Sequence, residues 1–180
     1  MPIYFEHLID TGRDVHAVAQ SLGLEWDVSA YAPLLQFFPC ESLAPDGDYD
    51  LFIVNFKLPF QNHSITGENL WIDEISKANP YAYQVMLNRA TAASKGLEDG
   101  ALVVVESRHG SETCRLKVTE LIHPECVGIP GMFGHWAAGR PVSRKKGAAF
   151  NNLLPHPTLA RIDTVTGQID TCARVRVRRA

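Results

Sequence analysis

The sequence lacks the features that mark several protein classes. It contains no run of about 18 apolar residues, so no membrane-spanning helix is predicted. Its N-terminus has neither the basic patch nor the apolar stretch of a secretory signal peptide. It has no internal repeat and no low-complexity tract, and hydrophobic residues make up 46% of its 180 residues. This composition is typical of a folded, soluble domain rather than a disordered or fibrous chain.

Cysteine and histidine are present without the spacing of a metal site. The four cysteines form no C-x-x-C pair, which gives no support to a structural zinc site or a thioredoxin-like motif. The seven histidines show no H-E-x-x-H or similar pattern. Cys114 and Cys172 lie in strand-like alternation, where a buried free thiol is the expected role. We therefore expect no metal bound directly by this chain.

The charge is small overall but unevenly distributed. Residues 139–180 carry nine lysines and arginines against two acids, a charge of +7, whereas residues 1–138 carry eight against eighteen, a charge of −10. The two sum to the net charge of −3. The basic quarter indicates either a surface that faces an anionic partner or arginines on a solvated strand. Nucleic acid is disfavoured, because no aromatic residues interleave the basic run and the isoelectric point is near 6.1.

Residues 1–47 differ from the rest of the chain. Phe5–Leu22 has a loosely helical periodicity that ends before Gly23, and an irregular stretch rich in proline and aromatic residues follows. The apolar side chains of that stretch need a cover from a neighbouring surface, and they include Leu34, Leu35, Phe37 and Phe38. We predict that 1–47 is a lead-in segment from a preceding domain and that 48–180 is a separate domain.

Short β-rich segments follow from Tyr49 onward. Leu51–Val54 is an unbroken apolar run, which predicts a strand buried on both faces. Residues 101–107 and 113–120 are predicted to form a hairpin about a turn at 108–111. The remaining predicted strands are Val85–Leu87, Cys126–Ile129 and Cys172–Arg178.

Two short helices are expected among these strands. One spans Asn69–Lys77 and places Trp71 and Ile75 on one side. The other spans Arg89–Lys95, with Asn88 as its N-cap and Gly96 just past its end. A mainly β fold with short helices and several short strands indicates a small closed or partly closed β-barrel.

Three polar segments punctuated by glycine follow predicted strands. Residues 62–69 could present donors to phosphate or a heterocycle, or form a self-capped turn. Residues 131–139 suit close approach of a ligand and stacking on Trp136, unless Phe133 and Trp136 plug the barrel end. Residues 147–154 include adjacent amides at 151 and 152, which can read the edge of a heterocycle or cap a turn.

The order of these segments resembles the C-terminal domain of the molybdopterin-dinucleotide oxidoreductases, the dimethyl sulfoxide reductase superfamily. The resemblance runs from about Asp48 to Arg178 and includes the strand Tyr49–Phe56 with the His63-Ser64 loop after it. The other matching blocks are NRATAASKGLEDGALVVVES from Asn88, TELIHPECV from Thr119, GHWAAG from Gly134, GAAFNNL from Gly147 and DTVTG from Asp163. The lead-in, with Glu6, Trp26 and Tyr31-Ala32-Pro33, is similar to the preceding stretch of thiosulfate, polysulfide and arsenate reductase-like members.

The family implies a double-psi β-barrel that covers one side of a bis(molybdopterin guanine dinucleotide) cofactor holding molybdenum or tungsten. By motif position, the residues implied to bind the cofactor are Asn55, Lys57, His63, Ser64, Thr66, Asn69, Gly134, His135, Trp136, Asn151, Asn152, Thr171 and Cys172. The metal is held through the cofactor and not by this chain. The domain's task is to position and tune the cofactor, and no catalytic residue is assigned.

The resemblance also implies a setting for the domain. In the family, the iron–sulfur cysteine cluster and the metal-ligating residue belong to earlier domains, and nothing before Asp48 matches them. We expect a C-terminal part of a longer catalytic subunit, or a separate barrel subunit, of an oxidoreductase of anaerobic respiration. Implied partners are the remaining domains, iron–sulfur electron-transfer subunits and membrane-anchor subunits, at the cytoplasmic or periplasmic face of a bacterial or archaeal membrane. The isolated chain is not expected to turn over substrate.

Two other functions are compatible with the residues alone. One is a freestanding β-barrel that serves as a non-redox binding or interaction module, although such a module would need no apolar lead-in. The other is a small hydrolase with a cysteine nucleophile and a histidine base, for which the sequence shows neither a nucleophile elbow nor a Cys/His pairing at a recognisable turn.

Overall fold

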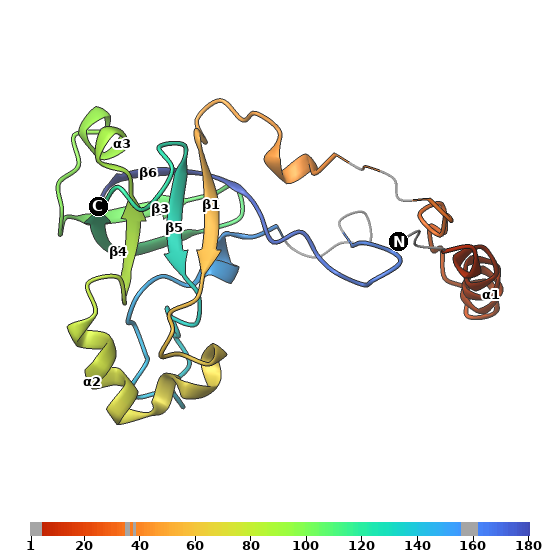
Figure 1. Cartoon of the computed structure of the whole chain (residues 1–180), viewed down its shortest axis with the longest axis horizontal. Coiled ribbons are helices and arrows are strands. Elements are labelled where there is room, and N and C mark those ends of the chain that lie inside the picture. The colour runs from red at the N-terminus through yellow and green to blue at the C-terminus, as the bar shows by residue number, and fades with distance from the viewer. Residues whose placement is uncertain (1–4, 35–36, 38, 156–161) are drawn as a thin grey trace. The chain divides into compact units, whose positions relative to one another are not determined.

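Six short strands close into a barrel (Figure 1). The structure is a computed structural model and describes residues 5–34, 37, 39–155 and 162–180, so Leu35 and Phe38 lie outside it. In order around the barrel the strands are β1 (Leu51–Phe56), β5 (Cys126–Pro130), β2 (Gln84–Leu87), β4 (Ser111–Val118), β3 (Leu102–Glu106) and β6 (Arg174–Arg179). β1 pairs in parallel with β5, and β2 with β4, while the other neighbours are antiparallel. The prediction of a mainly β, closed barrel is confirmed.

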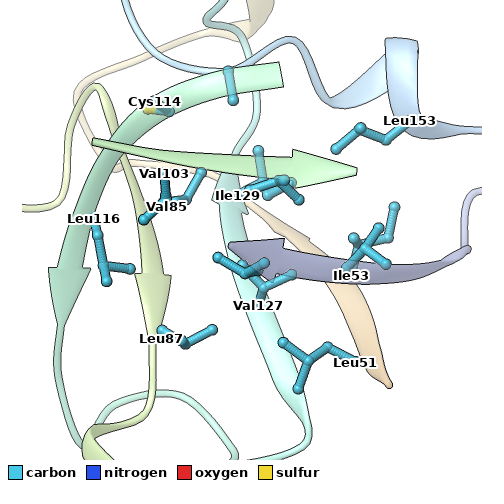
Figure 2. Close-up of a cluster of buried hydrophobic side chains, with 14 of the residues drawn as sticks. Leu51, Ile53, Val85, Leu87, Val103, Cys114, Leu116, Val127, Ile129 and Leu153 are labelled. Carbon is cyan, nitrogen blue, oxygen red and sulfur yellow. The ribbon is translucent and has the colours of Figure 1, made fainter. Parts of the chain in front are cut away.

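The barrel interior is filled by alternate aliphatic side chains of every strand (Figure 2). Side chains of a strand point to opposite faces in turn, so one residue in two reaches the core. Leu51 and Ile53 of β1 are buried, whereas Val54 is 39% exposed. The expectation that this strand is buried on both faces is therefore wrong, because a barrel strand has one inner face. Leu153, at the end of η3 (Phe150–Leu153) between β5 and β6, completes the core.

The strand directions place three connections at the same end of the barrel. β1, β3 and β5 finish at this end, and β2, β4 and β6 begin there. We call it the loop end; it carries residues 57–83 after β1, 107–110 after β3 and 131–155 after β5. Because β5 lies between β1 and β2 in the sheet, the 57–83 connection must cross over the point where β5 finishes. The connections after β1 and after β5 are thus forced together.

Both α-helices described in the barrel unit begin at an asparagine that caps them, which was predicted for Asn88. α2 (Leu70–Ala78) lies beyond the arrowheads of β1 and β5, and the side chain of Asn69 accepts hydrogen bonds from the first backbone N–H groups of this helix (Figure 1). α3 (Arg89–Ser94) lies at the opposite end and is capped by Asn88. The predicted apolar side of α2 faces outward, with Trp71 83% exposed. Within the described ranges, no helix is both long enough and apolar enough to cross a membrane.

The arginines of β6 are engaged within the barrel unit itself. Arg176 donates to Glu106 on the neighbouring strand at 3.0 Å, and the guanidinium of Arg178 lies 3.5 Å from the same carboxylate. Arg174 stacks over the ring of Phe52, with 3.7 Å between the guanidinium carbon and the ring centroid, and donates to the carbonyl of Leu43 in η1 (Glu41–Leu43). Along β6, Val175 and Val177 point into the barrel, and Arg174, Arg176 and Arg178 between and beside them make contacts on the outer face.

The first part of the chain belongs to a second compact unit, which consists of Met1–Glu41 and Pro157–Asp170; the barrel unit consists of Ser42–His156 and Thr171–Ala180. Within the smaller unit, α1 (His7–Ser21) confirms the predicted helix. Trp26 and Tyr31 both donate to the carbonyl of Thr164, at 3.2 and 2.8 Å. These hydrogen bonds join the lead-in to the segment around Thr164, which lies within the predicted barrel domain 48–180.

The packing of the barrel predicts which leucine matters for stability. Leu116 of β4 is fully buried, so Leu116→Ala should lower the free energy of unfolding by about 2–5 kcal/mol, from lost transfer free energy and the cavity left behind. Leu102→Ala on the adjacent strand is the matched control, because that side chain is 48% exposed and its loss should change stability by about 0.5 kcal/mol. Urea unfolding of both variants measures the difference, and equal losses would contradict this interior.

Candidate functional site

The resemblance implies a set of cofactor ligands, and all of them lie at the loop end or within a few residues of it. Asn55 is exposed near the end of β1, and Lys57 begins the first connection. The others lie in the connections after β1 and β5 or directly before β6: His63, Ser64, Thr66, Asn69, Gly134, His135, Trp136, Asn151, Asn152, Thr171 and Cys172. Topology alone therefore gathers residues that are more than 100 positions apart in the sequence.

The first connection uses part of its polar side chains to hold its own shape. The hydroxyl of Thr66 donates to Gln61 at 2.7 Å and accepts from the backbone N–H of Asn62, and the side-chain oxygen of Asn69 caps α2. Lys57 Nζ lies 3.4 Å from His63 Nε2, both side chains being exposed. The turn η2 (His63–Glu68) within this connection is therefore held by hydrogen bonds of the connection itself, while Lys57 and His63 remain exposed to solvent.

The connection after β5 is fastened to the first one by Glu68. One carboxylate oxygen accepts from the backbone N–H and the hydroxyl of Ser143, at 3.0 and 2.5 Å, and the other accepts from the N–H of Val142 at 3.0 Å. The bond from the Ser143 hydroxyl holds the pKa of Glu68 below its ordinary value. In the reverse direction, Arg140 donates to the carbonyl of Ser64 at 2.7 Å.

A second carboxylate, Asp73 of α2, joins the same two connections. Its side chain is 4% exposed and pairs with Lys146, with Lys77 at 3.0 Å and with the hydroxyl of Tyr83 at 2.7 Å. Burial by itself raises the pKa of Asp73, but the hydrogen bonds from Lys146, Tyr83 and Lys77 outweigh it and lower the pKa to about 2. Asp73 is therefore a charged group held inside the loops and not a proton carrier near neutral pH.

The glycine-rich stretch folds back on its own chain. Gly134 has φ +77°, and a Cβ at this position would lie 2.1 Å from the backbone nitrogen of Ala149. This glycine is therefore required by the approach of the 148–149 backbone. Phe133 is buried against Tyr83, with ring centroids 4.6 Å apart, whereas Trp136 is 74% exposed. Of the two aromatic residues, Phe133 alone plugs the structure, and the indole is open for stacking.

Unusual backbone and an unpaired polar atom mark the same region. In the part of the chain that the structure describes, the non-glycine residues with positive φ are His63, Tyr83, Met132 and Lys145, all in connections of the loop end. Such strain persists only where the surroundings enforce it, and it concentrates at functional sites. His135 Nε2 is buried and has no hydrogen-bond partner among the described residues, so it is available to a group from outside them.

The two adjacent amides lie on a different side of the loop end. Asn152 donates to Glu112 at the start of β4, at 2.5 Å, and its carbonyl packs so tightly on Gly110 that a Cβ there would lie 2.2 Å away. Asn151 is exposed in η3. Asn152 therefore has a structural partner, while Asn151 is free to face a ligand. Thr171 is exposed and Cys172 is half-buried, so the expectation of a buried Cys172 is wrong.

Cys114 is the buried free thiol that its alternation predicts. It donates to the carbonyl of Tyr83 at 3.1 Å, and burial raises its pKa to about 11. Burial also raises the pKa of Cys126. Both groups are thus protonated thiols at neutral pH, which disfavours a cysteine hydrolase because the thiolate is the nucleophile.

Sequence reasoning missed the residues that fasten the loops to each other. Glu68, Asp73, Arg140, Ser143 and Lys146 were not among the candidates. Their partners lie 73 to 76 positions away, and no local motif reports such a pairing. The one available signal was that Glu68 falls inside the first polar segment, where a carboxylate is out of place beside an anionic ligand.

Comparisons with known proteins agree on one kind of domain. A family model described as "Molydopterin dinucleotide binding domain" matches residues 51–170. The arsenate respiratory reductase molybdopterin-containing subunit ArrA of Chrysiogenes arsenatis is 30% identical over 148 residues, which cover 74% of this chain and 17% of that protein. The assimilatory nitrate reductase catalytic subunit of Bacillus subtilis is 29% identical over 119 residues, covering 66% and 16%.

The fold also recurs in a solved structure, acetylene hydratase from Pelobacter acetylenicus. It matches 91% of this chain and 22% of that one with a TM-score of 0.62 at 17% identity, which shows a shared fold. The chain thus spans about one sixth of the length of the two curated relatives described above.

The Asp73 network predicts a pH dependence of stability. A carboxyl with a lowered folded-state pKa stabilises the fold above its unfolded value of 3.8, and this contribution is lost as the pH falls toward about 2. The stability difference between the wild type and Asp73→Asn should therefore shrink as the pH falls from about 4 to 2. Glu74→Gln is the control, since Glu74 is exposed and its ion pair with Lys77 lies along α2. Urea unfolding across this range tests the expectation, and a constant difference would contradict it.

Proposed function

Because the chain belongs to the molydopterin dinucleotide binding domain family, we propose that the loop end of its barrel holds a molybdopterin guanine dinucleotide within an oxidoreductase. The observation that carries the location is the meeting of two polar connections, after β1 and after β5, at that end. Backbone strain at four residues of these connections supports the same location.

The side chains that remain available at the loop end fit such a ligand. Its phosphates need cations and N–H donors, which Lys57, Arg144 and Lys145 present as exposed groups. Its pterin and guanine rings need amide groups for hydrogen bonding and a flat side chain for stacking, and the exposed Asn55, Asn151 and Trp136 provide them. The buried Nε2 of His135 has no hydrogen-bond partner among the described residues and can bond to the ligand. Thr66, Asn69, Gly134 and Asn152 act instead by holding the backbone in place.

The work is divided between the cofactor and the chain. When bound, the cofactor supplies the redox chemistry of molybdenum or tungsten. The residues of this chain bind its polar arms, orient them and exclude water from one side of them. The loop-end hydroxyls of Ser143 and Tyr83 donate to Glu68 and Asp73 and thereby hold the loops together, so no catalytic residue is proposed here.

The domain is proposed to act within a larger catalytic subunit, because its relatives are about six times as long as the part they share with it. The relatives are named for arsenate and nitrate, and the solved structure for acetylene. Since one barrel serves proteins named for such different molecules, the substrate is determined outside the barrel. Iron–sulfur electron-transfer subunits and membrane-anchor subunits are the partners proposed for the whole protein.

The metal content of the native protein tests the proposal directly. We expect near-stoichiometric molybdenum or tungsten, measured by mass spectrometry on protein captured through this domain. Metal on a far larger polypeptide supports a domain of a catalytic subunit, and metal on a complex with a ~20 kDa chain supports a separate barrel subunit. A metal-free species of 19.9 kDa would overturn the oxidoreductase and favour the freestanding binding module.

The adjacent amides provide a test by mutation. Asn151→Ala with Asn152→Ala should weaken retention of the dinucleotide by about tenfold, because Asn151 loses a hydrogen bond to the ligand of about 0.5–1.5 kcal/mol and Asn152 loses the bond to Glu112 that holds η3 in place. Asn151→Ala alone separates contact with the ligand from the bond between Asn152 and Glu112. Glu98→Gln at the opposite end of the barrel is the control. Unchanged molybdenum content in the double variant would contradict a role for these amides.

A further inference from the structure

Two carboxylates, Glu68 and Asp73, lie at an end of the barrel that is proposed to receive a polyanion. We infer that they are positioning residues, which hold the 131–147 segment against the 57–83 connection in the shape that receives the dinucleotide. The inference rests on the proposed function. It assigns a role to residues that neither the sequence motifs nor the family match singles out.

Both carboxylate oxygens of Glu68 are engaged by the chain itself. Both of its oxygens accept from Val142 and Ser143, which form one turn of the 131–147 segment. Arg140 lies two residues before Val142 and donates a hydrogen bond to the backbone carbonyl of Ser64. The contact is thus reciprocal: each connection supplies a charged side chain that is satisfied by the backbone of the other.

Asp73 joins the same two connections through side chains instead of backbone groups. It is nearly inaccessible, and its three partners come from α2 (Lys77), from the residue before β2 (Tyr83) and from the end of the 131–147 segment (Lys146). Lys146 Nζ also lies 5.5 Å from the centroid of the Tyr83 ring. The negative charge that would repel a phosphate is therefore neutralised inside the loops.

The two tethers bracket the strained backbone. Tyr83 at φ +59° contacts Asp73 directly, and Lys145 at φ +59° lies between Ser143 and Lys146, the partners of the two carboxylates. Positive φ in a residue with a side chain costs about 1–3 kcal/mol and relaxes when the surroundings no longer enforce it. A segment that relaxes must be reordered when ligand binds, and this ordering lowers the affinity.

The experiment measures binding and local order separately. The 180-residue chain carrying Glu68→Ala or Asp73→Asn is titrated with guanosine diphosphate, which has the guanine, ribose and phosphates of the dinucleotide arm, at a temperature where each variant is fully folded. Amide hydrogen exchange is followed over 131–147 in the same samples. Glu68→Gln, which keeps one acceptor oxygen, serves if the alanine variant does not fold. Glu74→Gln is the control on the same helix.

We expect each variant to bind guanosine diphosphate about tenfold more weakly, as for the loss of one charge-assisted hydrogen bond, with faster exchange over 131–147 and unchanged exchange in the barrel strands. Glu68→Gln should fall between the wild type and Glu68→Ala. Unchanged affinity with faster exchange would reduce both carboxylates to a structural role and overturn the inference while the proposed function stands. A wild-type chain that does not bind guanosine diphosphate would overturn the dinucleotide site itself, and the positioning role with it.

Discussion

A closed barrel whose neighbouring strands are not consecutive in sequence forces its connections to cross. β5 separates β1 from β2, so the chain that leaves β1 must pass over the point where β5 finishes before it can form β2. The connections after β1 and after β5 consequently share one end of the barrel. Parallel pairing of β1 with β5 makes both strands finish at this end, so the chain leaves each of them at the same place. The polar loops, their strain and their tethers all follow from this crossing.

Crossing loops create a problem of charge and of backbone hydrogen bonding. Irregular backbone near the core must have its N–H groups satisfied, and Glu68 does this for the turn at Val142 and Ser143. A carboxylate suits that task because it accepts several bonds, and its charge is then spread over the donors. Asp73 solves the same problem where α2 meets Lys146 and Tyr83. Acids at this end are therefore compatible with an anionic ligand.

Local patterns predicted the elements and missed the contacts between them. Alternating valines and leucines identified the strands, and Asn69 and Asn88 marked helix starts, because these signals depend on near neighbours. Burial of β1 on both faces was predicted wrongly, since an apolar run does not reveal that a barrel has one interior. The tethers from Glu68 and Asp73 depend on residues more than 70 positions apart, and most strand neighbours in the barrel are not consecutive in sequence. Such pairings leave no periodic trace in a single sequence.

The basic C-terminal quarter separates into two parts with different tasks. On β6, Arg176 and Arg178 form ion pairs with Glu106 of the neighbouring strand β3, so their charge is balanced within the sheet. At the loop end, Arg140 and Lys146 fasten the connections. Within the described ranges, Arg144 and Lys145 form no ion pair, and they stand between those two fastened residues. The loops thus leave two exposed cationic residues between two fastened ones, and this is where we propose that the phosphates of the ligand bind.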